Sequence, residues 1–155
     1  MDLELYSCLV RSDDTYNLKR FVTAQDGGVY ERAIAELRRG VARSHWSWFI
    51  FPQLSGLGRS AMARLYAISC LDEARAYIDH PVLGPRLVES AWVVEASPAS
   101  DAVRILGPVD AMKLHSSMTL FLRAKPEEPV FKRVLDKYFA GELDAATEAV
   151  LARAG

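Results

Sequence analysis

A block of aromatic residues in the first half of the chain most constrains the fold. Residues 43–53 read RSHWSWFIFPQ and contain two of the three tryptophans, two phenylalanines and no acidic residue. Water disfavours an apolar run this dense, so we expect it at the centre of the core. Its polar ends, Arg43, His45 and Gln53, should then lie at an opening at the edge of that core.

The conformation of this block is ambiguous in the sequence. As a helix, the block places Trp46, Phe49 and Ile50 on one side. As a strand, it alternates Trp46, Trp48 and Ile50 with the residues between them. Periodicity does not separate the two for a short run that is apolar on both faces. A helix is favoured because Ser44 is a good N-cap residue and the surrounding sequence is helical.

The rest of the chain has helical periodicity. Apolar residues fall at i, i+3, i+4 and i+7 from Tyr30 to Leu37. Gly40 is expected to end this helix, because glycine readily adopts the left-handed conformation found after helix C-termini. There is no alternating strand run and no hairpin dipeptide. We therefore predict an all-α fold, a compact domain of about eight short helices joined by glycine and proline turns. Further helices are predicted at 15–26, 60–68, 71–78, 84–96, 101–106, 110–125, 131–140 and 144–153.

These patterns also predict which side chains form the core. Apolar residues at helical spacing in the later helices should pack against the aromatic block. The predicted core contains Trp46, Phe49, Ile50, Leu65, Leu114, Met118, Phe121, Phe131, Val134 and Leu135.

Length and charge limit the class of protein. A chain of 155 residues is predicted to form one domain, residues 15–153, preceded by an N-terminal extension, residues 1–14. With a net charge of −1, the chain lacks the overall positive charge that nucleic-acid-binding proteins carry, so we do not expect a nucleic-acid partner. Cys8 and Cys70 show no metal or redox spacing and are expected to be free thiols.

We also expect no membrane partner. No run approaches the roughly 20 apolar residues that a membrane span needs. The acidic N-terminus lacks the basic region of a signal peptide, so a cytoplasmic location is expected. The oligomeric state does not follow from the sequence.

A glycine-rich loop follows the aromatic block. Residues 56–61 read GLGRSA and match the spacing of a dinucleotide-binding loop. That function needs a preceding strand in a parallel sheet, which the sequence does not predict, so we reject it. Two interpretations remain open for Arg59 and Ser60: an anion-binding helix start, or a plain turn with an N-cap.

A second unusual stretch lies in the helix predicted at 110–125. Lys113, Ser116 and Ser117 fall at i, i+3 and i+4, so they share one helix surface. Hydroxyls inside a helix compete with its backbone hydrogen bonds, so two together need a reason. They either allow another helix to approach closely or help to bind an anionic or sugar-like ligand, and both interpretations stay open.

Recognisable catalytic and metal-binding patterns are absent from the sequence. His45, His80 and His115 have no metal-ligand spacing, so we expect neither a metal nor another cofactor. The sequence has no nucleophile elbow and no carboxylate pair isolated among apolar residues. Whether the protein is an enzyme is therefore left open.

Residues 43–53 together with residues 56–60 resemble the signature of the bacterial domain-of-unknown-function family 1810, some of whose members carry the label calpastatin. The resemblance extends to residues 18–25, 66–69, 80–87, 110–113 and 116–121, and so covers about residues 15–150. It implies a compact multihelical domain and no established activity. Val41 and Ala42 stand where the family usually has basic residues.

Two hypotheses for function follow. The first is a pocket for a small anionic molecule, such as a nucleotide or an ADP-ribose-like compound. Its predicted residues are Arg43, His45, Trp46, Trp48, Gln53, Arg59, Ser60, Lys113, Ser116 and Ser117. The second is a non-catalytic protein-interaction or regulatory domain. Under the first hypothesis, alanine at Arg43 and Lys113 should abolish binding with little effect on stability, because both are expected to be exposed charges.

Overall fold

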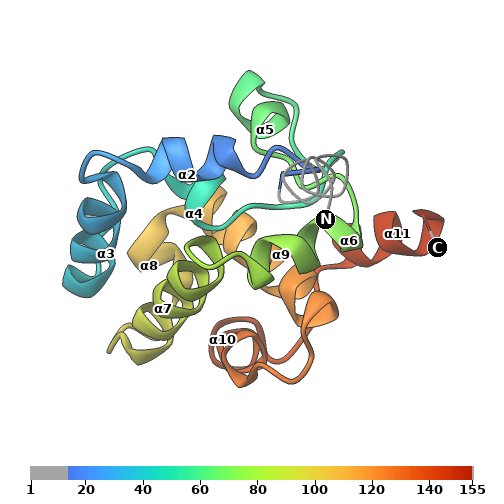
Figure 1. The fold of residues 1–155 in the computed structure, drawn as a ribbon. Coiled ribbons are helices and arrows are strands. Elements are labelled where there is room, and N and C mark those ends of the chain that lie inside the picture. The colour runs from blue at the N-terminus through green and yellow to red at the C-terminus, as the bar shows by residue number, and fades with distance from the viewer. Residues whose placement is uncertain (1–13, 155) are drawn as a thin grey trace.

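Helices supply the regular structure of the part of the chain that the computed structural model describes, residues 14–154 (Figure 1). The all-α prediction is confirmed, with ten helices in this range where about eight were expected. In chain order they are α2 (Lys19–Gln25), α3 (Val29–Arg39), α4 (Ser47–Ile50), α5 (Ala61–Leu65), α6 (Leu71–Asp79), α7 (Leu83–Ala96), α8 (Ala102–Leu106), α9 (Pro108–Ala124), α10 (Pro129–Phe139) and α11 (Ala145–Ala154). Within residues 14–154, none of these helices combines the length and the apolar character that a membrane span requires.

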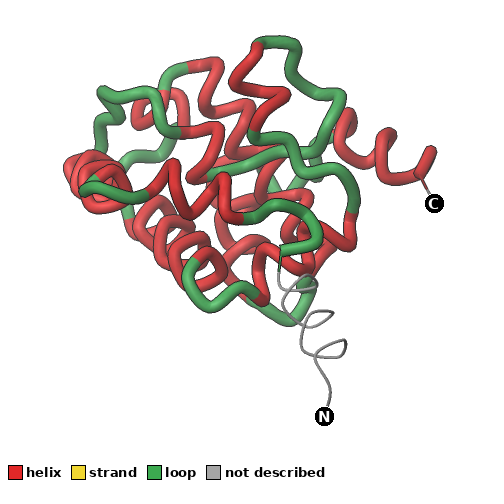
Figure 2. Tube along the Cα trace, turned by 45° about the horizontal axis from the view of Figure 1, so that its top comes forward, coloured by secondary structure: helices red, strands yellow, loops and turns green. Residues whose placement is uncertain are grey.

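The predicted N-terminal extension lies outside the described residues except for Asp14, and so does Cys8. The described chain is drawn as helix and loop alone in Figure 2. Helices α3 and α11 lie at opposite ends of the molecule in Figure 1.

Helix α3 forms where the apolar spacing predicts it. Ala33 and Leu37 are fully or almost fully buried on its inner face. Gly28 and Gly40 bound the helix with φ of 86° and 79°. Both positions need the left-handed conformation that glycine adopts without strain, so the two ends of α3 are encoded locally.

The aromatic block is helical for one turn only. Helix α4 covers Ser47–Ile50, and Phe51 then leaves it with φ −123° and ψ 73°. The cause is Pro52, because proline disfavours the helical conformation in the residue before it. Beyond the proline the chain is extended enough for Leu54 to make an isolated parallel bridge with Ile68.

The predicted N-cap of this helix is wrong. Trp46, not Ser44, occupies the cap position, and no side chain caps the helix. The Ser44 hydroxyl instead donates a hydrogen bond to Glu36 Oε2, at 2.7 Å. The hydroxyl that was expected to cap α4 is therefore hydrogen-bonded to a buried glutamate on another helix.

Glu36 of α3 holds the segment that leads into the block. Its carboxylate accepts hydrogen bonds from the backbone N–H groups of Arg43 (2.7 Å) and Ser44 (3.0 Å). It also accepts the indole N–H of Trp46, at 2.9 Å. The side chain is buried, so these bonds form where water competes little. The carboxylate thus fixes both the loop after α3 and the first aromatic residue of the block.

These bonds change the acidity of Glu36. Burial of the carboxylate by itself raises its pKa. The hydrogen bonds from Arg43, Trp46 and Ser44 outweigh burial and lower the pKa from 4.5 to about 2. Glu36 is therefore ionised when folded, and its bonds stabilise the charged form.

Helix α9 lies at the centre of the helix packing. It contacts α4, α6, α8, α10 and α11. Leu114, Met118 and Phe121 on α9 are fully buried. The predicted core is confirmed for every residue except one. Leu65, the last residue of α5, is 52% exposed.

The error at Leu65 comes from the length of α5. The spacing of apolar residues suggested a helix that continued through Ile68. The helix ends at Leu65 instead, and Ile68 becomes fully buried from an extended segment. A helix of five residues has too little surface to bury a whole apolar stripe.

Replacing Phe121 with alanine should lower the free energy of unfolding by about 3–5 kcal/mol, because the ring is fully buried. Urea unfolding measures this difference. Val103→Ala is the matched control: Val103 is 44% exposed, and a change within about 0.5 kcal/mol is expected. A loss below about 1 kcal/mol for Phe121→Ala would contradict the described core.

The stability of the protein should depend on Glu36 below about pH 4.5. A folded-state pKa lowered from 4.5 to about 2 corresponds to about 3 kcal/mol of stability. This contribution is complete above the unfolded pKa and is lost as the pH falls through the folded one. The wild type should therefore lose its advantage over Glu36→Gln between about pH 4.5 and about pH 2, as measured by urea unfolding.

The control for this experiment is Glu127→Gln, which changes an exposed carboxylate on the loop before α10. Its unfolding free energy should follow that of the wild type across the same range. A constant gap between wild type and Glu36→Gln at every pH would show that the carboxylate charge is not what holds the segment.

Candidate functional site

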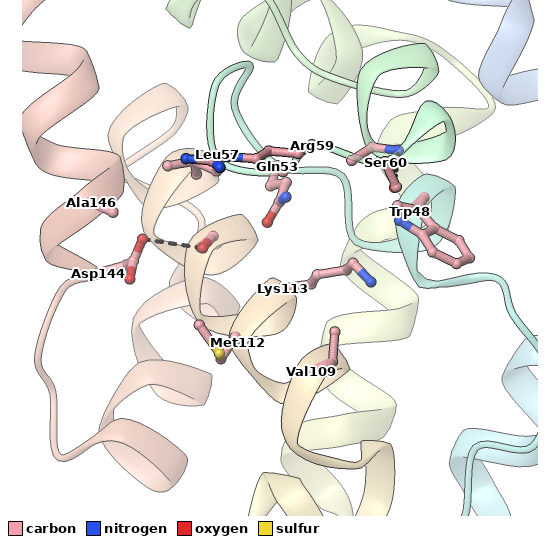
Figure 3. Close-up of a pocket in the computed structure, with 13 residues that line it drawn as sticks. Trp48, Gln53, Leu57, Arg59, Ser60, Val109, Met112, Lys113, Asp144 and Ala146 are labelled. Carbon is pink, nitrogen blue, oxygen red and sulfur yellow. Dashed lines mark hydrogen bonds between the residues drawn. The ribbon is translucent and has the colours of Figure 1, made fainter.

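A cleft of about 420 Å³ opens where four separate segments meet. These are the aromatic block, the glycine-rich loop, the outer side of α9 and the start of α11 (Figure 3). Residues from all four line it: Trp48, Gln53, Leu57, Gly58, Arg59, Ser60, Ala63, Val109, Met112, Lys113, Ser116, Asp144 and Ala146. Six of the ten predicted site residues are among them.

The glycine-rich loop forms one wall because two of its positions are tightly constrained. Gly56 has φ of 96°, which favours glycine. A Cβ on Gly58 would lie 2.5 Å from Ala63 Cβ and 3.0 Å from Gln53 Nε2, so only glycine allows this approach. Ser60 then caps α5 by accepting the N–H of Ala63, at 3.1 Å. The N-cap prediction for Ser60 is confirmed.

Three polar groups from the glycine-rich loop and the aromatic block have no hydrogen-bond partner among the described residues. They are the Arg59 guanidinium, the Gln53 side-chain amide and the Trp48 indole N–H. Arg59 is exposed, whereas Gln53 and Trp48 are partly buried. The cleft thus offers donors that the protein itself does not use.

Lys113 approaches the same cleft from α9. Its ammonium lies 3.0 Å from Asp110 Oδ1 and 4.2 Å from the centre of the Trp48 indole ring. Figure 3 shows the side chain extended toward Trp48. The lysine therefore covers part of one indole face in this structure.

The expectation that Lys113 is an exposed charge is wrong. The residue is only 9% exposed, because α9 places it between the aromatic block and its own first turn. A partly desolvated cation of this kind is tied to its partners more strongly than a surface charge. Replacing Lys113 should therefore change the stability of the fold as well as ligand binding.

Ser116 meets an acid that the sequence interpretation missed. Its hydroxyl donates to Asp144 Oδ2, at 3.1 Å. The same oxygen accepts the backbone N–H (3.0 Å) and the hydroxyl (2.6 Å) of Thr147. Asp144 is thus the N-cap of α11. The signal for the cap was present, an aspartate three residues before a threonine at a helix start, but nothing local linked it to Ser116.

Two predicted residues on the approach to the block lie outside the cleft lining. The Arg43 backbone N–H is held by Glu36, and its side chain is exposed. His45 is also exposed, with its ring centre 6.2 Å from that of Trp48. Val41, one of the two departures from the family pattern, does not line the cleft either.

Two further predicted residues are buried away from the cleft. Trp46 is 2% exposed and donates its indole N–H to Glu36. Ser117 is fully buried, and its hydroxyl finds no partner in the described part of the chain. For Ser117 the structure favours the helix-packing interpretation over the ligand-binding one. Residues 14–154 also hold no cluster of three or more metal-ligating side chains.

Comparisons with known proteins are consistent with the fold. The profile of a family described as "Protein of unknown function (DUF1810)" matches residues 15–151. The crystal structure of the conserved hypothetical protein Rv1873 from Mycobacterium tuberculosis is similar, with 49% sequence identity and a TM-score of 0.87. That similarity covers 90% of this chain and 99% of the other. No match was found among curated proteins.

The two cations of the cleft should differ in their effect on stability. Lys113→Ala should lower the free energy of unfolding by about 1–3 kcal/mol, since it removes a partly desolvated ion pair and a cation–π contact. Arg59→Ala should change it by less than about 1 kcal/mol, because the exposed guanidinium has no ion-pair partner among the described residues. Urea unfolding of the two variants tests the contrast. Equal losses would contradict the placement of Lys113.

Proposed function

This chain belongs to the DUF1810 family of proteins of unknown function, and we propose that its cleft binds a small anionic organic molecule of the nucleotide or ADP-ribose-like kind. The proposal concerns binding. The residues around the cleft do not assign a general acid, a general base or a nucleophile to a reaction.

The observation that carries the proposal is the convergence of unused donors on a mainly apolar cleft. Arg59, Gln53 and Trp48 come from two segments and reach one space whose other walls include Leu57 and Met112. A concave apolar site with a few converging polar groups is the usual form of a small-molecule site. Its volume of about 420 Å³ falls in the usual range for such sites, roughly 300–1,000 Å³.

The proposed anionic group binds Arg59. A guanidinium presents two parallel N–H donors that match the oxygens of a phosphate or carboxylate. Lys113 adds a second positive charge on the α9 side, although it is already paired with Asp110. Because that lysine covers part of Trp48, the apolar part of the ligand is expected against Leu57, Val109 and Met112.

The competing function is a protein-interaction surface without catalysis. The observation that favours it is the exposure of two apolar side chains at the mouth of the cleft, Val109 (65%) and Met112 (72%). The two residues are neighbours on the surface of α9, and contiguous exposed apolar patches mark binding surfaces for other proteins. A thermal-shift screen with small anions separates the two functions, because a protein-interaction surface does not require a small anion.

A thermal-shift screen with nucleotides, ADP-ribose, NAD and sugar phosphates tests the proposal. A ligand at about 100 times its dissociation constant should stabilise the protein by about 2.7 kcal/mol. Arg59→Ala should remove this shift while leaving the melting temperature without ligand nearly unchanged.

Arg43→Ala is the matched control, since it removes an exposed arginine that does not line the cleft. It should keep the ligand-induced shift. If no compound in the screen stabilises the wild type, or if Arg59→Ala responds like the wild type, the anion-binding function is wrong.

A further inference from the structure

The cleft holds both signs of charge. Lys113 and Asp110 form an ion pair with each other. Arg59 and Asp144 form no ion pair among the described residues. One positive and one negative group are thus left for a ligand, and the carboxylate would repel a ligand with two or more phosphate groups more strongly than one with a single phosphate.

Asp144 has one oxygen already committed and one oxygen available. Oδ2 accepts the three hydrogen bonds from Ser116 and Thr147. No described residue donates to Oδ1. The three bonds hold the carboxylate in place on the cleft wall, across from Lys113 (Figure 3). An ionised carboxylate oxygen is an acceptor only, so whatever lies against it must donate.

The position of Asp144 also favours one kind of donor over another. It caps the N-terminus of α11, a helix of ten residues, and so lies at the positive end of the helix dipole. That end offsets part of the negative charge of the carboxylate, so it weakens the attraction for an ammonium group and leaves a neutral hydroxyl unaffected. A hydroxyl also keeps its hydrogen bond to a charged acceptor, which is stronger than a bond between neutral groups.

We infer that Asp144 is a specificity-determining residue that accepts hydrogen bonds from the ribose hydroxyls of a nucleoside monophosphate. This inference rests on the proposed anion-binding function and narrows its ligand. The single phosphate binds Arg59, the hydroxyls donate to Asp144, and the base lies along the apolar wall that contains Val109 and Met112. Ser116 and Thr147 act as positioning residues for the carboxylate.

Isothermal titration calorimetry with AMP, GMP, CMP and UMP, and with their 2′,3′-dideoxy counterparts, tests this inference. The dideoxy compounds keep the phosphate and the base but lack the donors. For the wild type, the ribonucleotide that binds best should bind about 10–100 times more tightly than its dideoxy form, the range expected for a hydrogen bond to a charged group.

The variant for this test is Asp144→Asn, which keeps the shape of the side chain and a good N-cap residue. In this variant the ratio between the two compounds should fall to about 1–2, while the dideoxy compound binds at least as tightly as it does to the wild type, because a negative charge near its phosphate is removed. Asp79→Asn is the control, because Asp79 is an exposed carboxylate at the end of α6 and away from the cleft lining. It should keep the wild-type ratio.

The outcomes separate this inference from the proposed function. If ribonucleotide and dideoxynucleotide bind the wild type equally, Asp144 does not recognise hydroxyls, although the anion-binding function stands. The same conclusion follows if Asp144→Asn, with an unchanged melting temperature, keeps the wild-type ratio. If none of the eight compounds binds, the inference is wrong, and the screen with Arg59→Ala decides on the proposed function.

Discussion

The carboxylate of Glu36 is the contact on which the rest of the structure depends. It gathers four donors from the segment after α3: two backbone N–H groups, the Ser44 hydroxyl and the Trp46 indole. A loop that enters a hydrophobic core would otherwise bury these groups without partners, which costs free energy for each of them. With them satisfied, the aromatic block enters the core in one orientation, and Trp48 and Gln53 reach the cleft.

The backbone carbonyl groups at the far end of the block also need hydrogen-bond partners, and residues more distant in the chain provide them. Helix α4 is too short to satisfy its own carbonyl groups. The carbonyl of Phe49 accepts the side-chain amide of Gln25, at 2.8 Å, from the buried end of α2. The carbonyl of Gln53 accepts the backbone N–H of Ile68, at 2.9 Å, and Ser55 N–H donates back to the Ile68 carbonyl, at 2.7 Å. These bonds hold the glycine-rich loop against the body of the protein, so the proposed ligand site is built on a supported wall.

Helix α9 belongs both to the core and to the cleft, and the boundary between them runs between adjacent residues. Ser116 reaches Asp144 at the cleft, whereas Ser117, the next residue along, is fully buried without a partner. Each step along a helix turns about 100°, so neighbouring residues face different surroundings. Because other helices surround most of α9, the local sequence does not show whether a polar residue of this helix belongs to a site or lies where two helices pack together.

The sequence by itself determined the all-α class, most helix positions and nearly all of the core. These follow from short-range causes: the spacing around Tyr30 and Leu37, the glycine at 40, and the cap at Ser60. Of the residues that the sequence grouped as a predicted site, Arg59, Ser60, Lys113 and Ser116 are among those that line the cleft. Only the tertiary structure decided that Glu36 holds Ser44, that Leu65 is exposed and that Asp144 completes the cleft. Each of these depends on a partner, or on space, provided by residues elsewhere in the chain. A local sequence pattern indicates that a segment is helical, but it does not identify the distant residues that the side chains of the segment contact.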